Sequence, residues 1–380
     1  MSYNIAVLTS HPIQYQTPLF KALAARKDIK LTVFFQSDPS SRGNFDKGFG
    51  IPIRWDRPLL EGYTYQFLKN PLEIIAILKR QKFCALLIHS YATLLSLAGY
   101  IGGSVFDVPI LLHTESEMLR QRNNWFQRIK TLILKILFFK TAAFLCIGNQ
   151  NHQFYKSFNI PETRIFQTPY CVDNDFFLQQ GNIWKQKRFE TLRELSLPSR
   201  QPTIVFSGKL IQRKRPFDLL STYTAVQQKG YQANLILIGE GALRNQIEQY
   251  IKENHLEYAR VIGFKNQTEI SKFYSVGDIF VLPSGFDTWG LVINEAMLFS
   301  MPVITTDKVG AGYDLIEDGH TGYRYPAGDI NALAHYLITL LTQEDLRKKM
   351  GENSLQKVQG YSYDKCIGGI MDALSCTADR

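Results

Sequence analysis

Short apolar runs alternate with longer amphipathic segments along almost the whole chain, and this alternation restricts the fold more than any other feature. Helical patterns such as PLFKALAAR and LRNQIEQYIKENH separate the runs. Strands that alternate with helices form parallel sheets covered by helices. The sequence therefore predicts an α/β fold. The runs with the character of buried strands are 5–8, 31–35, 85–89, 109–113 and 143–148, then 203–208, 234–239, 260–263, 278–283 and 302–306.

The strand–helix pattern restarts near residue 203, after a stretch that contains several prolines and turn residues. A chain of 380 residues is long enough for about two domains of roughly 100–200 residues each. We predict two Rossmann-like domains, 1–185 and 200–358, separated by a cleft, with a last helix at about 360–376 that packs back on the first domain. In such sheets ligands bind beyond the carboxyl ends of the strands.

The composition excludes a disordered chain, because 45% of the residues are hydrophobic and only 20% are charged. Five cysteines without metal-ligand spacing favour a reduced, cytoplasmic protein. The opening residues MSYNIAVLTSHP predict a first strand rather than a signal peptide. No run of 18 uncharged apolar residues occurs in the sequence, so we expect at most a peripheral contact with the inner face of the cell membrane.

The positive charge is concentrated in the first half of the chain. Residues 1–185 carry 21 Lys and Arg against 12 Asp and Glu, whereas residues 186–380 carry 22 of each. An excess of this kind favours an anionic surface or ligand near the first half.

A basic segment follows the strand predicted at 203–208. In TIVFSGKLIQRKRP the strand ends at Gly208, and Lys209, Arg213, Lys214 and Arg215 come next. Cations at the carboxyl end of a strand can bind a polyphosphate. The alternative is a basic loop that is simply exposed to solvent.

The next strand runs into Gly239-Glu240-Gly241, and a helix follows. Glycines at such a turn let the backbone approach a ligand, so Gly208, Gly239 and Glu240 are candidate ligand-binding residues. An ordinary tight turn is an equally good explanation. A nicotinamide-dependent oxidoreductase is disfavoured, because Arg244 stands where a dinucleotide-binding motif has its third glycine.

The segment SGFDTWGLVINEAM, residues 284–297, places two carboxylates around the predicted start of a helix near Thr288–Leu291. Free N–H groups at a helix start favour a phosphate, and Gly290 lets the backbone come close to it. The carboxylates of Asp287 and Glu295 suit sugar and ribose hydroxyls. Alternatively, Asp287 caps the helix and Glu295 lies on the surface. Together with the basic loop, the segment predicts a sugar-nucleotide site.

These segments resemble glycosyltransferase family 4. The resemblance is carried by VLPSGFDTWGLVINEAM, by MPVITTDKVGAGYDLIEDGHTGYRYPAGD and by FSGKLIQRKRP; it is strong over roughly 200–330 and looser from the start of the chain to 180. It implies a GT-B fold, in which the sheets of two Rossmann-like domains face across a cleft. It also implies a retaining enzyme that needs neither a metal nor another cofactor.

The resemblance assigns roles to individual residues. The family's pair of glutamates, with seven residues between them, falls on Asp287 and Glu295, and its phosphate-binding Arg and Lys fall on Lys209 and Lys214. It implies that Glu295 binds the ribose and that Asp287, with the backbone of Trp289–Leu291, holds the donor sugar and distal phosphate. Two departures affect donor choice: Asp287 is one methylene shorter than Glu, and Lys209 lacks the planar fork of Arg.

The N-terminal half is predicted to bind the acceptor. In TSHPIQYQTPLF, Thr17 is a suitable N-cap for a helix, so the preceding His11, Gln14 and Tyr15, with Gln16, lie on a loop beyond the first strand. The alternative is a packed turn without a ligand.

Two histidines end predicted strands of the same half, His113 in PILLH and His89 in LIHSY. By the resemblance, His113 is a candidate for contact with the donor sugar near the reacting carbon, and His89 is a candidate on a similar basis. A purely structural histidine is the alternative for each.

The segment 124–140 predicts a basic amphipathic helix. Seven basic residues and no acidic one occur between Met118 and Ile160. Trp125, Ile129, Leu132, Ile133 and Ile136 share a face that suits an anionic membrane surface through residues 120–140, at roughly 1 kcal/mol per nearby basic residue. The alternative is a core helix with solvated lysines.

The sequence therefore predicts a glycosyltransferase that moves a sugar from a UDP- or GDP-sugar to a saccharide or lipid-linked acceptor, in polysaccharide or glycolipid biosynthesis. No nucleic-acid partner is expected. The alternatives are a GT-B sugar-nucleotide epimerase and a non-catalytic membrane-binding module.

Overall fold

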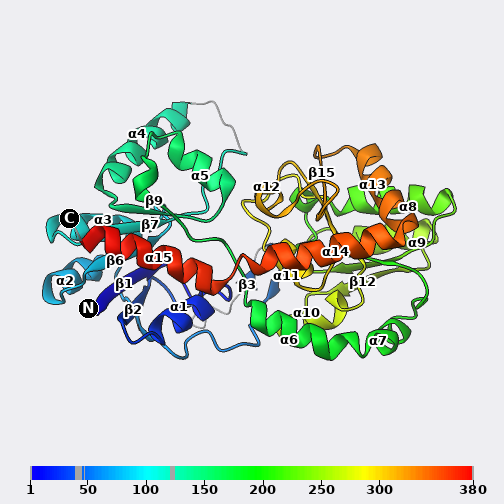
Figure 1. Cartoon of the computed structure of the whole chain (residues 1–380), viewed down its shortest axis with the longest axis horizontal. Coiled ribbons are helices and arrows are strands. Elements are labelled where there is room, and N and C mark those ends of the chain that lie inside the picture. Colours follow the sequence, from blue (N-terminus) through cyan, green and yellow to red (C-terminus); the bar gives the residue numbers. More distant parts are fainter. Residues whose placement is uncertain (1, 39–44, 47, 120–124, 379–380) are drawn as a thin grey trace. The chain divides into compact units, whose positions relative to one another are not determined.

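The computed structural model describes residues 2–38, 45–46, 48–119 and 125–378 of the chain. It divides into two compact units (Figure 1). Unit 1 comprises Met1–Gly43, Pro58–Cys171 and Tyr363–Arg380, and unit 2 comprises Asn44–Arg57 and Val172–Ser362. The chain thus passes into unit 2 ahead of the 180–200 boundary that the sequence predicts, because the helix that starts at Asn174 packs on helices of unit 2.

Unit 1 is built on a seven-stranded sheet in the order β5-β2-β1-β6-β7-β8-β9, in which every neighbouring pair is parallel. Its strands are β1 (Tyr3–Thr9), β2 (Ile29–Phe35), β5 (Thr64–Phe67), β6 (Ala85–His89), β7 (Ile110–His113), β8 (Ala143–Cys146) and β9 (Ile165–Gln167). Its helices are α1 (Thr17–Ala24), α2 (Glu73–Arg80), α3 (Leu94–Val105), α4 (Trp125–Lys140), α5 (Asn149–Lys156) and α15 (Tyr363–Ala378), with a 3₁₀ turn η2 (Glu162–Arg164).

Unit 2 is built on a six-stranded parallel sheet in the order β12-β11-β10-β13-β14-β15. Its strands are β10 (Thr203–Ser207), β11 (Asn234–Ile238), β12 (Ala259–Gly263), β13 (Ile279–Leu282), β14 (Val303–Thr306) and β15 (Gly322–Tyr325). Its helices are α6 (Asn174–Lys185), α7 (Arg188–Glu194), α8 (Pro216–Gln228), α9 (Arg244–Glu253), α10 (Gln267–Tyr274), α11 (Val292–Leu298), α12 (Gly312–Leu315), α13 (Ile330–Thr342) and α14 (Glu344–Gln359), with a 3₁₀ turn η3 (Gln212–Lys214).

All ten predicted strands are present, because strands covered on both faces need near-continuous apolar runs. In β11, for example, all five residues are buried. The edge strands β5, β9 and β15 were not predicted. Their residues are partly exposed, as in Thr64–Phe67, so no apolar run marks them.

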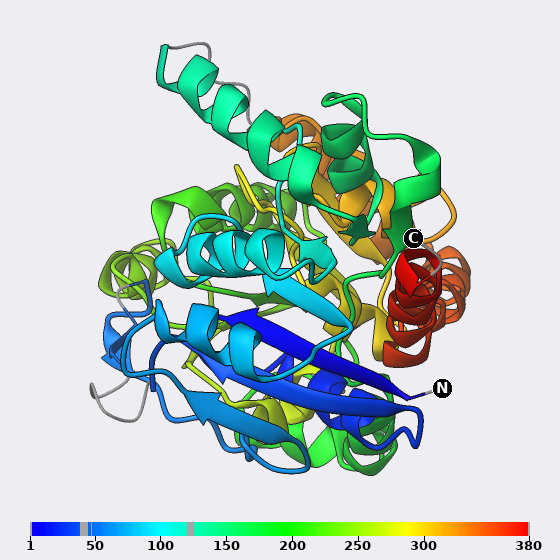
Figure 2. The same ribbon diagram turned by 90° about the vertical axis from the view of Figure 1, so that its left-hand side faces the viewer.

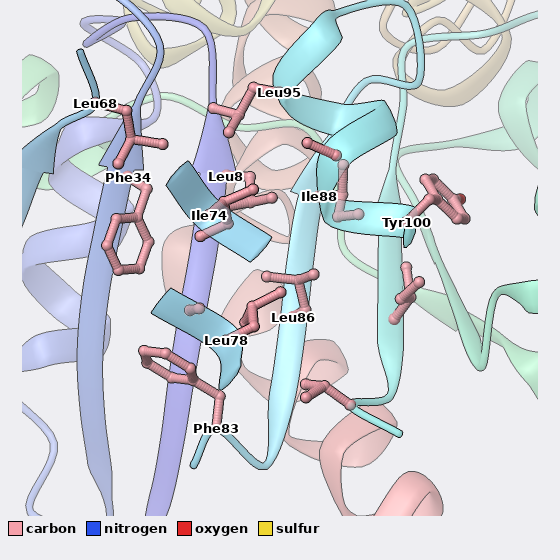
Figure 3. Close-up of a cluster of buried hydrophobic side chains, with 14 residues drawn as sticks. Leu8, Phe34, Leu68, Ile74, Leu78, Phe83, Leu86, Ile88, Leu95 and Tyr100 are labelled. Carbon is pink, nitrogen blue, oxygen red and sulfur yellow. The ribbon is translucent and has the colours of Figure 1, made fainter. Parts of the chain in front are cut away.

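A large apolar cluster lies between the sheet of unit 1 and helices α2 and α3 (Figure 3). Leu8 and Leu86 come from the sheet, Ile74 comes from α2, and Leu95 and Tyr100 come from α3. Burying one such aliphatic or aromatic side chain contributes about 1.5–3 kcal/mol. This cluster fixes one side of α3 on the sheet.

The last helix, α15, belongs to unit 1 and contacts α1, β8 and β9. A Cβ at Gly369 would lie 1.9 Å from the carbonyl oxygen of Gln167, so the helix approaches β9 too closely for any side chain at that position. Tyr363 Oη also donates a hydrogen bond of 3.2 Å to the carbonyl of Tyr15.

The segment Asn44–Arg57 belongs to unit 2 although its neighbours in the sequence belong to unit 1. We call this segment the arm. It contains the short antiparallel pair β3 (Phe45–Asp46) and β4 (Ile51–Pro52). The arm is held by the ring of Phe264, which contacts Phe49 and Trp55, and by a hydrogen bond from Thr268 N to the Asp56 carboxylate.

Candidate functional site

The order of the six strands in unit 2 reverses direction between β10 and β13, which are neighbours in the sheet. Loops that leave such a point diverge and create room for a ligand beyond the carboxyl ends. Here the two loops are joined by a hydrogen bond of 2.8 Å from Gly285 N to the carbonyl of Arg213. The basic segment and the carboxylate segment therefore meet at this point.

Lys214 and Asp287 form an ion pair across these two loops. Both side chains are largely buried, and a Cβ at Gly208 would lie 3.9 Å from Lys214 Cε. The next residue, Arg215, has a left-handed backbone with φ of 51°, which costs roughly 1–2 kcal/mol in a residue with a side chain. Strain of this size persists where the surrounding structure fixes it, and it often does so at functional sites.

Lys209 binds the arm. Its ammonium lies 2.7 and 2.9 Å from the two carboxylate oxygens of Asp46 and 4.7 Å from the centre of the Phe49 ring. Partial burial acts to raise the pKa of Asp46, but Lys209 and the N–H groups of Phe49 and Gly48 hold it below its ordinary value. Asp46 is therefore ionised at neutral pH. Sequence reasoning missed this partner, because Asp46 lies outside every predicted strand.

The Gly239-Glu240-Gly241 turn packs on the loop after β10. A Cβ at Gly239 would lie 1.9 Å from the carbonyl oxygen of Gly208, and one at Gly241 would lie 2.4 Å from that of Leu210. Both glycines thus permit close contact between the backbone of this turn and that of the loop after β10. Such packing agrees with the alternative that the turn is an ordinary tight turn. The carboxylate of Glu240 forms an ion pair with Arg244.

Helix α11 begins at Val292, just after the predicted start at Thr288–Leu291, and Leu291 is its N-cap. The alternative role of Asp287 as the cap is wrong, because α11 has no side-chain cap and Asp287 binds Lys214 instead. Gly290 has a φ of 94°, a conformation that favours glycine. Trp289 is buried, and its indole donates a hydrogen bond of 2.8 Å to the Asn294 side chain.

Glu295 is buried, with 2% of its surface exposed. Its carboxylate accepts a hydrogen bond of 2.8 Å from Tyr274 Oη. The alternative that Glu295 is a surface residue is therefore wrong, because its carboxylate is buried against Tyr274 of α10.

A pocket of about 470 Å³ lies in unit 1. Like the candidate site of unit 2, this pocket lies where the strand order of its sheet reverses, here between β1 and β6 of the seven-stranded sheet. The residues that line it follow the carboxyl ends of β1, β6 and β7 or come from α4: Thr9, Ser10, Ile13, Gln16, His89, Ser90, Tyr91, Ala92, His113, Thr114, Glu115, Ser116 and Lys130.

His89 and His113 lie side by side in this pocket, with ring centres 4.6 Å apart. Burial lowers the pKa of His113 to about 4, and burial together with the neighbouring His113 places the pKa of His89 well below its ordinary value. Both rings are therefore neutral at pH 7. His89 Nδ1 is buried and has no hydrogen-bond partner among the described residues, so a bound polar group could satisfy it.

The three acceptor candidates His11, Gln14 and Tyr15 do not line the pocket, whereas Gln16 does. His11 is exposed beside Ser10, and the carbonyl of Tyr15 is held by α15. The helix α1 includes Thr17 and has Gln16 as its N-cap, so the predicted cap is wrong by one residue. Ser90 was not predicted; its φ of 74° marks it as strained.

The basic helix α4 presents its predicted apolar face to solvent. Trp125, Ile129, Leu132, Ile133 and Ile136 are all exposed, and the core side of the helix is formed by other residues. The alternative of that face lying in the core is therefore wrong. Residues 120–124, the first part of the predicted membrane segment, lie outside the described residues. None of the helices in the described part of the chain has the length and apolarity needed to cross a membrane.

Residues 187–357 match the family of glycosyl transferases group 1. This region holds the basic loop, the glycine turn and the carboxylate segment. The match begins in α7 and ends in α14, so it covers most of unit 2.

Curated proteins similar to this chain include glycosyltransferases. An uncharacterized glycosyltransferase of Methanocaldococcus jannaschii is 33% identical over 137 residues, which are 36% of this chain and 39% of the relative. The capsular polysaccharide biosynthesis glycosyltransferase CapM of Staphylococcus aureus is 24% identical over 311 residues, 81% of this chain and 79% of CapM. The chain thus spans well under half of the first relative and about four fifths of the second.

Solved structures establish the fold over the whole chain. Anabaena HepE in complex with UDP has a TM-score of 0.76 at 15% identity, covering 99% of this chain and 100% of HepE. Sucrose-phosphate synthase of Thermosynechococcus elongatus has a TM-score of 0.71 at 18% identity, and each chain is covered completely. The chain has the GT-B fold of two Rossmann-like domains, as the sequence predicts.

Proposed function

We propose that this chain transfers a sugar from a nucleoside diphosphate sugar to an acceptor hydroxyl, with retention at the anomeric carbon, in polysaccharide or glycolipid assembly. The observation that carries the proposal is the Lys214–Asp287 pair at the strand-order reversal of unit 2, inside the region that matches the transferase family. The structures of HepE with UDP and with UDP-glucose support UDP as the carrier, and GDP is the other candidate.

In the proposed reaction the bond between the anomeric carbon and the diphosphate oxygen breaks, and both electrons leave with the diphosphate. The acceptor oxygen bonds to the same face of that carbon, and its proton passes to the leaving diphosphate. The main obstacle is the charge that builds up on the leaving group, and fixed cations lower that barrier. An ammonium has three N–H donors, so Lys214 can hold Asp287 and a phosphate oxygen together. Lys209 supplies a second cation.

The carboxylates position the donor in this proposal. Asp287 and the backbone of Trp289–Leu291 hold the sugar and the distal phosphate, and Glu295 accepts hydrogen bonds from the ribose. A carboxylate has about four lone-pair sites, so the bond from Tyr274 does not exclude a ribose hydroxyl. Gly208, Gly239 and Glu240 complete the donor side.

The pocket of unit 1 receives the acceptor. Its lining includes His113 and His89, and the unsatisfied His89 Nδ1 can exchange a hydrogen bond with a hydroxyl. Because both imidazoles are neutral at pH 7, they offer hydrogen bonds rather than positive charge. The exposed apolar face of α4, with its lysines, supports peripheral attachment to an anionic membrane surface.

The test compares wild-type protein with Lys214→Ala and Lys214→Arg on a panel of UDP- and GDP-sugars, with and without membrane and saccharide acceptors. We expect Lys214→Ala to lower the rate of sugar transfer on the order of 100-fold and to weaken nucleotide binding. Lys214→Arg should keep part of the transfer rate and part of the affinity. The exposed Lys229→Ala is the matched control. Near wild-type turnover by Lys214→Ala would refute the assignment of Lys214 to the diphosphate.

The same assay separates a transferase from an epimerase. An epimerase converts the nucleotide sugar without an acceptor, whereas a transferase forms a glycoside only when the acceptor is added. We also expect turnover to persist in excess EDTA. Loss of activity that Mn²⁺ restores would contradict the metal-independent mechanism.

A further inference from the structure

Helix α3 presents an uncharged, apolar face to solvent. Its sequence, LLSLAGYIGGSV, contains no charged residue. Leu94, Leu97, Ile101 and Val105 are each 46–61% exposed, and they recur at the spacing of one helical face. The opposite face packs on the sheet of unit 1 through the cluster described above. The exposed apolar face is therefore additional to the one that α3 needs for folding.

Helix α4 has the same two-sided character. Leu134 and Phe138 are buried in a core cluster of unit 1. The side chains on the other side are 46–82% exposed: Trp125, Ile129, Leu132, Ile133, Ile136 and Phe139. A helix that is apolar on both sides is normally covered on both sides.

The two helices adjoin. They contact each other, and Tyr100 Oη of α3 lies 2.8 Å from Thr141 Oγ1, just beyond the end of α4. Leu137 of α4 packs against the cluster that contains Tyr100. Figure 2 shows α4 above α3 on the side of unit 1 that is turned to the viewer. We call the ten exposed apolar side chains of α3 and α4 the two-helix patch.

More than half of the large apolar side chains that are exposed in the described part of the chain belong to the two-helix patch. Scattered exposed apolar residues are normal, but so many on two adjoining helices indicate an interaction surface. Its surroundings indicate the partner. Arg128, Lys130, Lys135 and Lys140 of α4 are exposed beside it, and the sequence contains no acidic residue from Met118 to Ile160. An apolar face flanked by cations complements anionic lipid headgroups above acyl chains.

The pocket of unit 1 is lined in part by residues near the N-terminal ends of α3 and α4. Lys130, in the second turn of α4, lines the pocket, and so do Tyr91 and Ala92, which lie directly before the N-cap of α3. The ammonium of Lys130 also lies 5.6 Å from the centre of the Tyr91 ring. A surface that covers the patch therefore reaches the edge of the pocket.

We propose that the two-helix patch, α3 included, docks unit 1 on an anionic lipid bilayer, and that the pocket takes the polar head of an acceptor anchored in that bilayer. The acceptor part rests on the proposed transferase function, whereas the docking part does not. In this arrangement the acceptor keeps its acyl or isoprenoid chain in the membrane while its hydroxyl enters the pocket.

The first experiment measures flotation of the full chain with phosphatidylcholine vesicles that contain or lack phosphatidylglycerol. Wild type should bind the anionic vesicles. The α3 variant Leu97→Glu/Ile101→Glu and the α4 variant Ile133→Glu/Ile136→Glu should each lose at least about tenfold in affinity, because charged side chains do not enter the acyl region. The matched control is Phe189→Glu/Ile330→Glu, which changes exposed apolar residues of unit 2 and should bind like wild type.

A second measurement does not depend on loss of binding. Trp125→Phe with Ile101→Trp places an indole on α3, and Trp125→Phe alone supplies the background from the other tryptophans. Brominated phosphatidylcholine mixed into the anionic vesicles should quench the fluorescence of the indole at 101. No quenching at 101, or wild-type flotation of the α3 variant, would overturn the role of α3. Wild type that floats on neither vesicle, but forms a dimer that the α3 variant abolishes, would assign the patch to a second copy of the chain.

Separate measurements test the membrane docking and the proposed transferase function. Binding of UDP and GDP, measured by calorimetry without vesicles, should be the same in wild type and in the α3 variant. If wild type binds anionic vesicles but neither UDP nor GDP, the proposed transferase function is rejected and the membrane docking is kept. Label from radioactive UDP-glucose or GDP-mannose, incubated with membranes of the source cell, should appear in an organic-solvent extract. Label found only in water-soluble products would overturn the membrane-anchored acceptor.

Discussion

Lys209 and Asp46 are 163 residues apart in the sequence, yet the lysine ammonium lies 2.7 and 2.9 Å from the two oxygens of the aspartate. The lysine follows β10 of unit 2, and the aspartate belongs to the arm. A cation that we assign to the donor diphosphate is thus already neutralised by a carboxylate of the same unit. A diphosphate that binds Lys209 must share it with Asp46 or displace Asp46.

Asp46→Asn should strengthen nucleotide binding. The substitution keeps the shape of the side chain and removes the charge that competes with the diphosphate. Because the pair is partly exposed, we expect a modest gain, about threefold in Kd for UDP or GDP. Isothermal titration calorimetry measures it. Asp56→Asn is the matched control, since Asp56 holds the arm through Thr268 and does not bind Lys209. Equal affinities of wild type and Asp46→Asn would show that Lys209 does not contact the diphosphate.

Asp287→Glu should change which donors the protein accepts. Asp287 pairs with Lys214, and one more methylene moves the carboxylate toward the sugar and shifts this pair. We expect the ratio of kcat/KM between two nucleotide sugars that differ at one hydroxyl to change by about tenfold, which corresponds to about 1.4 kcal/mol. Competition assays with mixed donors measure the ratio. An unchanged ratio would remove Asp287 from donor selection.

The buried histidines should make stability fall in weak acid. The unfolded state binds protons below about pH 6.5, whereas folded His113 resists protonation down to about pH 4. Above pH 6.5 the side chain is neutral in both states, and its contribution to the free energy of unfolding is fully present. Between pH 6.5 and 4 only the unfolded state gains the proton. The free energy of unfolding therefore falls by about 1.4 kcal/mol per pH unit for one histidine as the pH is lowered through this window.

Urea unfolding of wild type and His113→Asn at several pH values from 7 to 4.5 measures this effect. Groups distant from His113 contribute equally to both proteins, whereas His89 loses the effect of its neighbour, so the difference between the two slopes reports the buried histidine pair. Parallel slopes would contradict the lowered pKa.

Gly239→Ala should destabilise unit 2 more than an alanine at another glycine of positive φ. A Cβ at Gly239 would collide with the carbonyl of Gly208, whereas a Cβ at Gly319 would meet nothing within 4 Å. We expect a loss of about 2 kcal/mol or more for Gly239→Ala and about 1 kcal/mol for Gly319→Ala, which suffers only the backbone strain. Thermal unfolding should show about twice the shift in Tm for Gly239→Ala. Equal shifts would mean that the two loops separate easily.

The sequence by itself determined the α/β class, ten of the strands and the loops that hold the candidate donor residues. These are properties of local pattern: a buried parallel strand needs a continuous apolar run, and residues directly after it lie at its carboxyl end. Local pattern alone therefore predicts that the basic loop and the carboxylate segment meet at this edge of the sheet.

Only the tertiary structure decided which side chains those residues bind and which faces stay uncovered. Asp46, Tyr274 and the adjacent His89 and His113 reach their positions through strand order and helix packing, which periodicity in one segment does not encode. For the same reason the exposed side of α3 was not predicted. An apolar residue looks the same in a sequence whether it faces a core or the surface, and only the arrangement of the other elements leaves one side of α3 and of α4 uncovered.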